Sequence, residues 1–223
     1  MSKPFEGSSV ASYLEGPPRQ VPGYDGLLRM TSLLLSETLS DDGRVLVLGE
    51  GGGLEIRAMA TEHPGWQFVG VDPSADMIAL AEKTTSSSAT NASLITGYIQ
   101  DAPDEQFDAA TCILTMHFVP KDERLATLQQ IRRRLKLGAP LVMAHISFDQ
   151  EEPARSEWIA RHVAFAGTSP GHVDAARKAI SERLTILSPD TEEKLLQQAG
   201  FRDISLIYAG LSFRGWIAFS AAN

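Results

Sequence analysis

The residues that decide the fold are Arg44-Val-Leu-Val-Leu-Gly49-Glu50-Gly51-Gly52-Gly53. Residues 44–49 predict a buried strand because 45–48 are apolar, and glycines occupy positions 49, 51 and 53. A helix is predicted near 54–61, so its amino end would open directly onto these glycines. Because glycine lets the backbone approach a ligand closely, the stretch predicts a strand, a ligand-binding turn and a helix.

Helical and strand-like patterns alternate on both sides of this turn. Leucines recur at helical spacing within 24–39, which predicts an amphipathic helix that covers the core. Further strands are predicted at 66–71, 93–98, 108–114 and 140–147, and further helices at 74–83 and 121–135. The alternation predicts an α/β fold: a doubly wound, mostly parallel sheet with helices on both faces.

The end of the chain departs from this rhythm. The segments 201–209 and 211–219 are strand-like and almost contiguous, which predicts an antiparallel hairpin. Between 149 and 187 the pattern is helical but mixed, and we expect these helices to lie over the sheet edge. We interpret 1–223 as a single domain, with an N-terminal segment and helix at 1–40 and a helical lid inserted at 149–187.

The composition is that of an ordinary globular domain. The chain has 223 residues, of which 43% are hydrophobic and 22% charged, so disordered and fibrous classes are excluded. Its formal net charge of −8 disfavours nucleic acid as a direct partner. The single cysteine, Cys112, excludes a disulfide framework and is expected in the core. Without a signal-like start or a membrane-length apolar run, we expect a cytoplasmic protein with no membrane partner.

An acidic residue supports the interpretation of the glycine turn as a binding site. Asp72 closes the next predicted strand about twenty residues later, where a carboxylate can accept hydrogen bonds from both ribose hydroxyls. The alternative is a charge at a helix amino end, although Ser74 already offers an N-cap there. The dinucleotide fingerprint needs a third glycine at position 54, which is Leu54, so we do not expect NAD or NADP to bind.

Three segments together carry a family resemblance. The G-x-G-x-G spacing resembles motif I of class I S-adenosylmethionine (SAM) methyltransferases, 106–118 resembles their strand-4 motif, and 134–142 resembles their LKPGG turn. The resemblance implies a Rossmann-like seven-stranded sheet of order 3-2-1-4-5-7-6 with strand 7 antiparallel. It also implies SAM as the cofactor and S-adenosylhomocysteine (SAH) as the product.

Within that superfamily, the flanks resemble the carboxy-SAM synthase and tRNA (cmo5U34) methyltransferase-like branch. Arg19-Gln-Val-Pro-Gly-Tyr24 resembles its R-x-VPGY segment, and 195–201 resembles its ending. The chain departs from the pattern at four positions: Val47 replaces the motif I acid, Glu50 a small residue, Tyr98 an aspartate and Ile113 an asparagine. The resemblance implies cofactor contacts from Tyr24, Gly49, Glu50, Gly51, Gly53, Asp72, Pro73, Met77, Tyr98, Ile99 and Leu114, with Tyr98 near the adenine.

The candidate catalytic residues are His117, His145 and Arg177. Both histidines fall near the predicted carboxyl ends of strands, where open α/β sheets bind ligands, so either is a general base or packs beside the pocket. Arg177 falls where the branch keeps an arginine for a carboxylate. We expect it to converge with Tyr24 over the cofactor's sulfur; the alternative is an exposed helix arginine. No residue grouping has metal-ligand spacing, so no metal is expected.

These observations favour a SAM-dependent methyltransferase, a transferase that acts on a small-molecule acceptor, which an arginine in the lid would allow to be anionic. One alternative is a carboxy-SAM synthase that uses SAM and prephenate. Another, from a different class, is a SAM-binding module without catalytic activity. A homodimer is compatible with the sequence, which does not name the acceptor.

Overall fold

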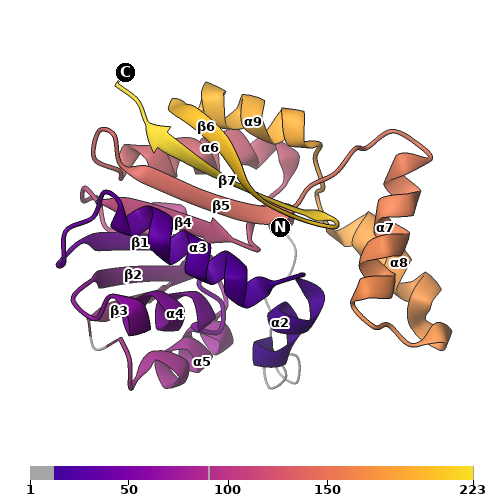
Figure 1. Ribbon diagram of the computed structural model, residues 1–223, viewed down its shortest axis with the longest axis horizontal. Coiled ribbons are helices and arrows are strands. Elements are labelled where there is room, and N and C mark those ends of the chain that lie inside the picture. The colour runs from indigo at the N-terminus through magenta and orange to yellow at the C-terminus, as the bar shows by residue number, and fades with distance from the viewer. Residues whose placement is uncertain (1–12, 90, 223) are drawn as a thin grey trace.

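The computed structural model of the chain describes residues 13–89 and 91–222. Its centre is a seven-stranded sheet with the order β3-β2-β1-β4-β5-β7-β6 (Figure 1). Strands β1 to β5 pair in parallel, and β7 runs antiparallel to both β5 and β6. The strands are β1 (Arg44–Leu48), β2 (Gln67–Asp72), β3 (Ala92–Thr96), β4 (Ala109–Ile113), β5 (Pro140–Ile146), β6 (Phe201–Gly210) and β7 (Phe213–Ser220). The predicted topology is confirmed.

Helices cover both faces of the sheet (Figure 1). On one face lie α3 (Tyr24–Ser36), α4 (Leu54–Glu62) and α5 (Ala75–Thr85), and on the other lie α6 (Lys121–Arg133) and α9 (Pro189–Gln198). The position of β1 in the sheet explains why its residues 45–48 are all apolar. Val45 and Val47 pack in the core of the first face, whereas Leu46 and Leu48 pack in the core of the second. A parallel strand covered on both sides must be hydrophobic on both sides.

A third group of elements lies beyond the carboxyl ends of the strands. Two short helices precede α3, η1 (Tyr13–Glu15) and α2 (Gly16–Gln20), and neither was predicted. The lid consists of α7 (Ala154–Phe165), η4 (Pro170–His172) and α8 (Val173–Arg183), and α7 and α8 pack against each other (Figure 1). The helices expected over the sheet edge therefore lie at its carboxyl edge.

The lid is joined to the sheet by its own hydrophobic cluster. Ile159 of α7 packs there with Ile113, Ile146 and Phe213 at the ends of β4, β5 and β7. Cys112 is fully buried in β4, as predicted. Among the described residues, no helix is both long and apolar enough to cross a bilayer.

Candidate functional site

The turn after β1 requires its glycines. Gly49, Gly51 and Gly53 have φ angles of +76°, +60° and +85°, a left-handed region that other residues rarely adopt. Space is also restricted, because a Cβ on Gly53 would lie 2.9 Å from the Cα of Ala81, and one on Gly49 would overlap the Thr115 side chain. The turn therefore brings backbone without side chains of its own to the amino end of α4, as a ligand cradle needs, and the Tyr13 and Leu14 side chains pack over Gly51 and Gly52.

Asp72, at the end of β2, holds this turn in place. Its Oδ2 accepts the Gly51 N–H at 3.1 Å, and its Oδ1 accepts the Ser74 N–H at 2.8 Å. Burial raises the pKa of Asp72, although both hydrogen bonds act to lower it. Ser74 is the predicted N-cap of α5, since its Oγ accepts the Met77 N–H at 3.2 Å. Each carboxylate oxygen keeps a lone pair for a ribose hydroxyl, so bracing and binding are compatible roles for Asp72.

The other predicted cofactor residues differ in exposure. Met77 and Ile99 are buried. Pro73, which follows β2, and Tyr98, which comes after β3, are exposed. The Tyr98 N–H donates to Asp101 Oδ2 at 2.8 Å, which closes the short helix η2 (Ile99–Asp101) and leaves the ring at the surface. Tyr24 is buried in the hydrophobic cluster below the lid, and this burial raises the pKa of its hydroxyl.

Two buried acids lie under the turn, where the sequence predicted only Glu50. Glu50 and Glu55 are each 4% exposed, and both Glu50 carboxylate oxygens and Oε1 of Glu55 have no hydrogen-bond partner. Burial and then the charge of Glu55 raise the pKa of Glu50, and burial raises the pKa of Glu55 to about 8. Val47, which replaces the motif I acid, is fully buried in the same region of β1. The carboxyl groups of Glu50 and Glu55 therefore carry a negative charge only after they release their protons.

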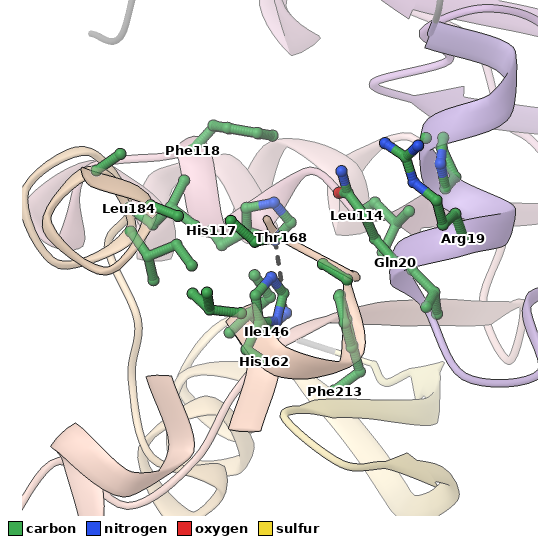
Figure 2. A pocket seen from close by; sticks show the side chains of 18 of the residues that line it. Arg19, Gln20, Leu114, His117, Phe118, Ile146, His162, Thr168, Leu184 and Phe213 are labelled. Atoms are coloured by element: carbon green, nitrogen blue, oxygen red, sulfur yellow. Dashed lines mark hydrogen bonds between the residues drawn. The ribbon is translucent and has the colours of Figure 1, made fainter. Parts of the chain in front are cut away.

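A cavity of about 440 Å³ lies between the ends of the sheet strands and the lid (Figure 2). Its walls are mostly apolar, with a few polar groups, as in many small-molecule sites. The polar side chains belong to Tyr13, Arg19, Gln20, His117, His162 and Thr168. The apolar ones include Leu114, Phe118, Ile146, Val163, Ile180, Leu184 and Phe213.

Leu114 and Tyr13 connect the cavity with the glycine turn. Leu114 follows β4 and lines the cavity with a φ of +58°, a strained value for leucine that is held by its N–H bond to the Ala144 carbonyl at 2.6 Å. Such strain gathers at functional sites. Tyr13 also lines the cavity, and its hydroxyl lies 2.6 Å from where a Cβ on Gly51 would be. A molecule on the turn and one in the cavity would therefore be neighbours.

His117, one of the candidate catalytic residues, lines the cavity. It lies in the short helix η3 (Met116–Phe118) after β4, and its Nδ1 accepts the Ile146 N–H at a long 3.5 Å. Burial, together with the neighbouring His145 and Arg124, lowers the pKa of His117 well below its usual value. The ring is therefore neutral near pH 7.

His145 and Arg177 do not line the cavity. His145 is fully buried in β5 with its Nε2 3.0 Å from Glu192 Oε1, and Glu192 also pairs with Arg124. This network favours the packing alternative over a general base. Arg177 is exposed on α8, outside the residues that line the cavity, so it does not converge with the buried Tyr24. The exposed-arginine alternative fits this placement.

Two cavity residues were not predicted to act. His162, on α7, is buried on the cavity wall with its Nδ1 2.7 Å from the Ser212 hydroxyl. Its sequence position, far from any strand end, gave no signal. Arg19 of α2 lines the cavity instead of Arg177, and its place in the R-x-VPGY segment was the available signal. No cluster of three potential metal ligands occurs within the described residues.

Comparisons with known proteins agree with this geometry. The family described as "Methyltransferase domain" matches residues 45–138, which contain the glycine turn, Asp72 and His117. The carboxy-S-adenosyl-L-methionine synthase of Colwellia psychrerythraea is 27% identical over 96% of this chain and 91% of its own length.

Solved structures show the same fold. A SAM-dependent methyltransferase from Methanosarcina mazei superposes with a TM-score of 0.64, at 17% identity, over 85% of this chain and 98% of that one. Human N-acetylserotonin methyltransferase in complex with SAM gives a TM-score of 0.59, at 17% identity, over 99% of this chain and 61% of that one. Sheet order, glycine turn and matched domain agree: residues 45–138 match a methyltransferase domain, the fold is that of SAM-dependent methyltransferases, and nearly the whole chain is similar to carboxy-SAM synthases.

Proposed function

We propose that the protein binds SAM over Gly49–Gly53 and transfers its methyl group to a small molecule in the lid cavity. The observation that carries this proposal is the continuity of the two spaces, since Leu114 and Tyr13 belong to the cavity and also adjoin the glycine turn or the strand beside it. Asp72 would hold the ribose, Tyr98 and Ile99 the adenine side, and Glu50 the charge near the cofactor's amino end. We place this reaction in the cytoplasm, where a lone buried cysteine stays reduced.

The residues around the cavity would act mainly by positioning. The sulfonium of bound SAM supplies an electrophilic methyl carbon. The apolar walls exclude water and leave few orientations for an acceptor, so its nucleophilic atom is held in line with the departing sulfur. Leu114, with its fixed backbone, lies where the two molecules would meet.

Calorimetry and mass spectrometry test the proposal. SAH should bind to the purified protein, and incubation with SAM and a pool of small-molecule metabolites should yield SAH together with one product that is heavier by a methyl group. SAH binding without any turnover would favour a SAM-binding module, and no SAH binding would contradict the proposal.

A second candidate is carboxy-SAM synthesis, because the curated relatives with this printed activity match nearly the whole chain. Its acidic partner would need a cation, and Arg19 is the arginine that lines the cavity. Incubation with SAM and prephenate would then give a heavier SAM derivative instead of SAH. Under this candidate Arg19→Ala abolishes the product, whereas Arg177→Ala, at an exposed position outside the cavity, leaves it unchanged.

A further inference from the structure

We propose that His162 is the general base of the cavity and that His117 is the hydrogen-bond donor beside it, so that together they select a phenol-type hydroxyl as the methyl acceptor. This inference rests on the proposed function, because it assigns the chemistry of the acceptor in that site. Both rings line the same cavity (Figure 2), and they come from segments 45 positions apart, one after β4 and one in the lid.

Ser212 holds the His162 ring. The serine lies in the turn between β6 and β7, is 1% exposed, and places its Oγ 2.7 Å from His162 Nδ1. The Phe213 ring packs against the same imidazole, with the ring centroids 5.4 Å apart. When Nδ1 donates to Ser212, the lone pair is on Nε2, which is then the ring nitrogen that can accept a proton. Burial lowers the pKa of His162, which keeps that lone pair free at neutral pH.

In His117 the donor and acceptor nitrogens are the reverse of those in His162. The backbone N–H of Ile146 points to its Nδ1, so this nitrogen accepts, and a neutral ring then carries its proton on Nε2. One neutral histidine therefore accepts a proton and the other donates a hydrogen bond. A hydroxyl group needs both at once, because it gives up its proton while its oxygen must be held for attack.

The walls define the rest of the acceptor. Phe118, Ile146, Val163, Leu184 and Phe213 surround the two histidines, and a volume of about 440 Å³ accommodates a ring. A phenol has a pKa of about 10, like tyrosine, so it is protonated near pH 7 and gains from a base. The hydroxyl oxygen forms a bond to the methyl carbon as the carbon–sulfur bond breaks, its electron pair remaining on sulfur. The hydroxyl proton passes to His162, and the products are an aryl methyl ether and SAH.

A matched pair of probes tests this inference. Protein first shown by calorimetry to bind SAH is titrated with 4-ethylphenol and with 4-ethylanisole, which lacks the hydroxyl proton. We expect the phenol to bind about tenfold more tightly, the worth of one good hydrogen bond, and His162→Phe to abolish the difference. With SAM in place of SAH, 4-ethylphenol should be converted to 4-ethylanisole, and His162→Phe should slow this on the order of 10²-fold.

His172 provides the control. It is also a lid histidine beside a serine, with its Nδ1 2.9 Å from Ser169 Oγ, but it is exposed and outside the cavity. His172→Phe should leave both probes and the rate unchanged. Ser212→Ala should weaken the preference for the phenol while His162 remains, and Ser212→Thr should restore it.

Failure of this inference can be distinguished from failure of the proposed function. Equal binding of the two probes, no binding of either, or an unchanged preference in His162→Phe would overturn the inference. Absence of SAH binding in the first titration would overturn the proposed function instead. Thermal unfolding of each variant identifies one that has failed to fold, in which case Ser212→Ala and its threonine rescue decide.

Discussion

At the residue scale, this chain lacks the acid of motif I and has buried carboxyl groups at other positions close by. Val47 replaces the motif I acid in β1, and two carboxyl groups are buried nearby, Glu50 in the glycine turn and Glu55 in the first turn of α4. Gly70 makes room for one of them, because a Cβ there would lie 3.2 Å from the Glu50 Cβ. Burial raises the pKa of both carboxyl groups, so a cation placed near them would favour the release of their protons.

The raised pKa of Glu55 predicts a dependence of stability on pH. Burial raises this pKa from 4.5 to about 8, so between these values the folded protein holds a proton that the unfolded chain releases. The free energy of unfolding should therefore fall as the pH rises from about 5 to 8, by on the order of 1 kcal/mol per unit. Glu55→Gln should reduce this slope in urea unfolding measured across that range. The exposed Glu62→Gln should not, and equal slopes in both variants would contradict the assignment.

Asp72 predicts a loss of cofactor affinity. Asp72→Ala removes a charged acceptor from the ribose hydroxyls and from the Gly51 N–H, and SAH binding should weaken by ~1.5–3 kcal/mol. Calorimetry measures this change, with Asp76→Ala, an exposed acid in the first turn of α5, as the control. An unchanged affinity in Asp72→Ala would remove Asp72 from the site.

At the scale of elements, a buried charge network anchors the lid. Arg124 of α6 donates to Glu192 of α9 and to the carbonyl of Thr185, where the chain leaves the lid. Glu192 also pairs with His145. Burial alone would raise the pKa of Glu192, but the interactions with His145 and Arg124 lower it. The Thr185 N–H donates to the His117 carbonyl at 2.9 Å, so the lid and the cavity histidine share one support.

Removing Glu192 should therefore be costly. Glu192→Ala leaves Arg124 buried without its carboxylate, and the free energy of unfolding should fall by ~3–5 kcal/mol in urea denaturation. The exposed pair Glu157–Arg161 gives the comparison, since Glu157→Ala should cost under ~1 kcal/mol. Equal losses in the two variants would show that the network is not a structural anchor.

Local pattern predicted the elements that are covered on both sides, and failed where distant segments meet. Apolar runs and glycines were sufficient for β1, the turn and α4, because those residues have local reasons for their conformation. The contact of His162 with Ser212 joins residues 50 positions apart, and no periodicity encodes it. Helix α2, Gly16–Gln20, contains two prolines in its first turn and has no apolar repeat, so its pattern is that of a loop. Arg177 was predicted from the resemblance, and the arginine that lines the cavity is Arg19.

At the scale of the whole molecule, the glycine turn and the cavity both lie at the carboxyl edge of the sheet beside β1 and β4, where the strand order reverses direction. The lid, the N-terminal helices and the first residue of β7 all contribute walls there. A dinucleotide site has a similar arrangement, and the residue at position 54 is where a SAM site and a dinucleotide site differ in sequence. Leu54 is 7% exposed and packs in the hydrophobic cluster below the lid, where the dinucleotide turn would need glycine.

The whole fold should therefore be stabilised by SAH and not by dinucleotides. A ligand that binds only the folded state adds about 2.7 kcal/mol at a concentration one hundred times its Kd, which is several degrees in Tm for a chain of this size. SAH and SAM should each raise Tm in a thermal-shift assay, whereas NAD and NADP at equal concentration should leave it unchanged. Asp72→Ala provides the internal control, because its shift with SAH should shrink at the same ligand concentration. Stabilisation by NAD comparable to that by SAH would instead indicate a dehydrogenase, since the glycine turn would then hold a pyrophosphate despite Leu54.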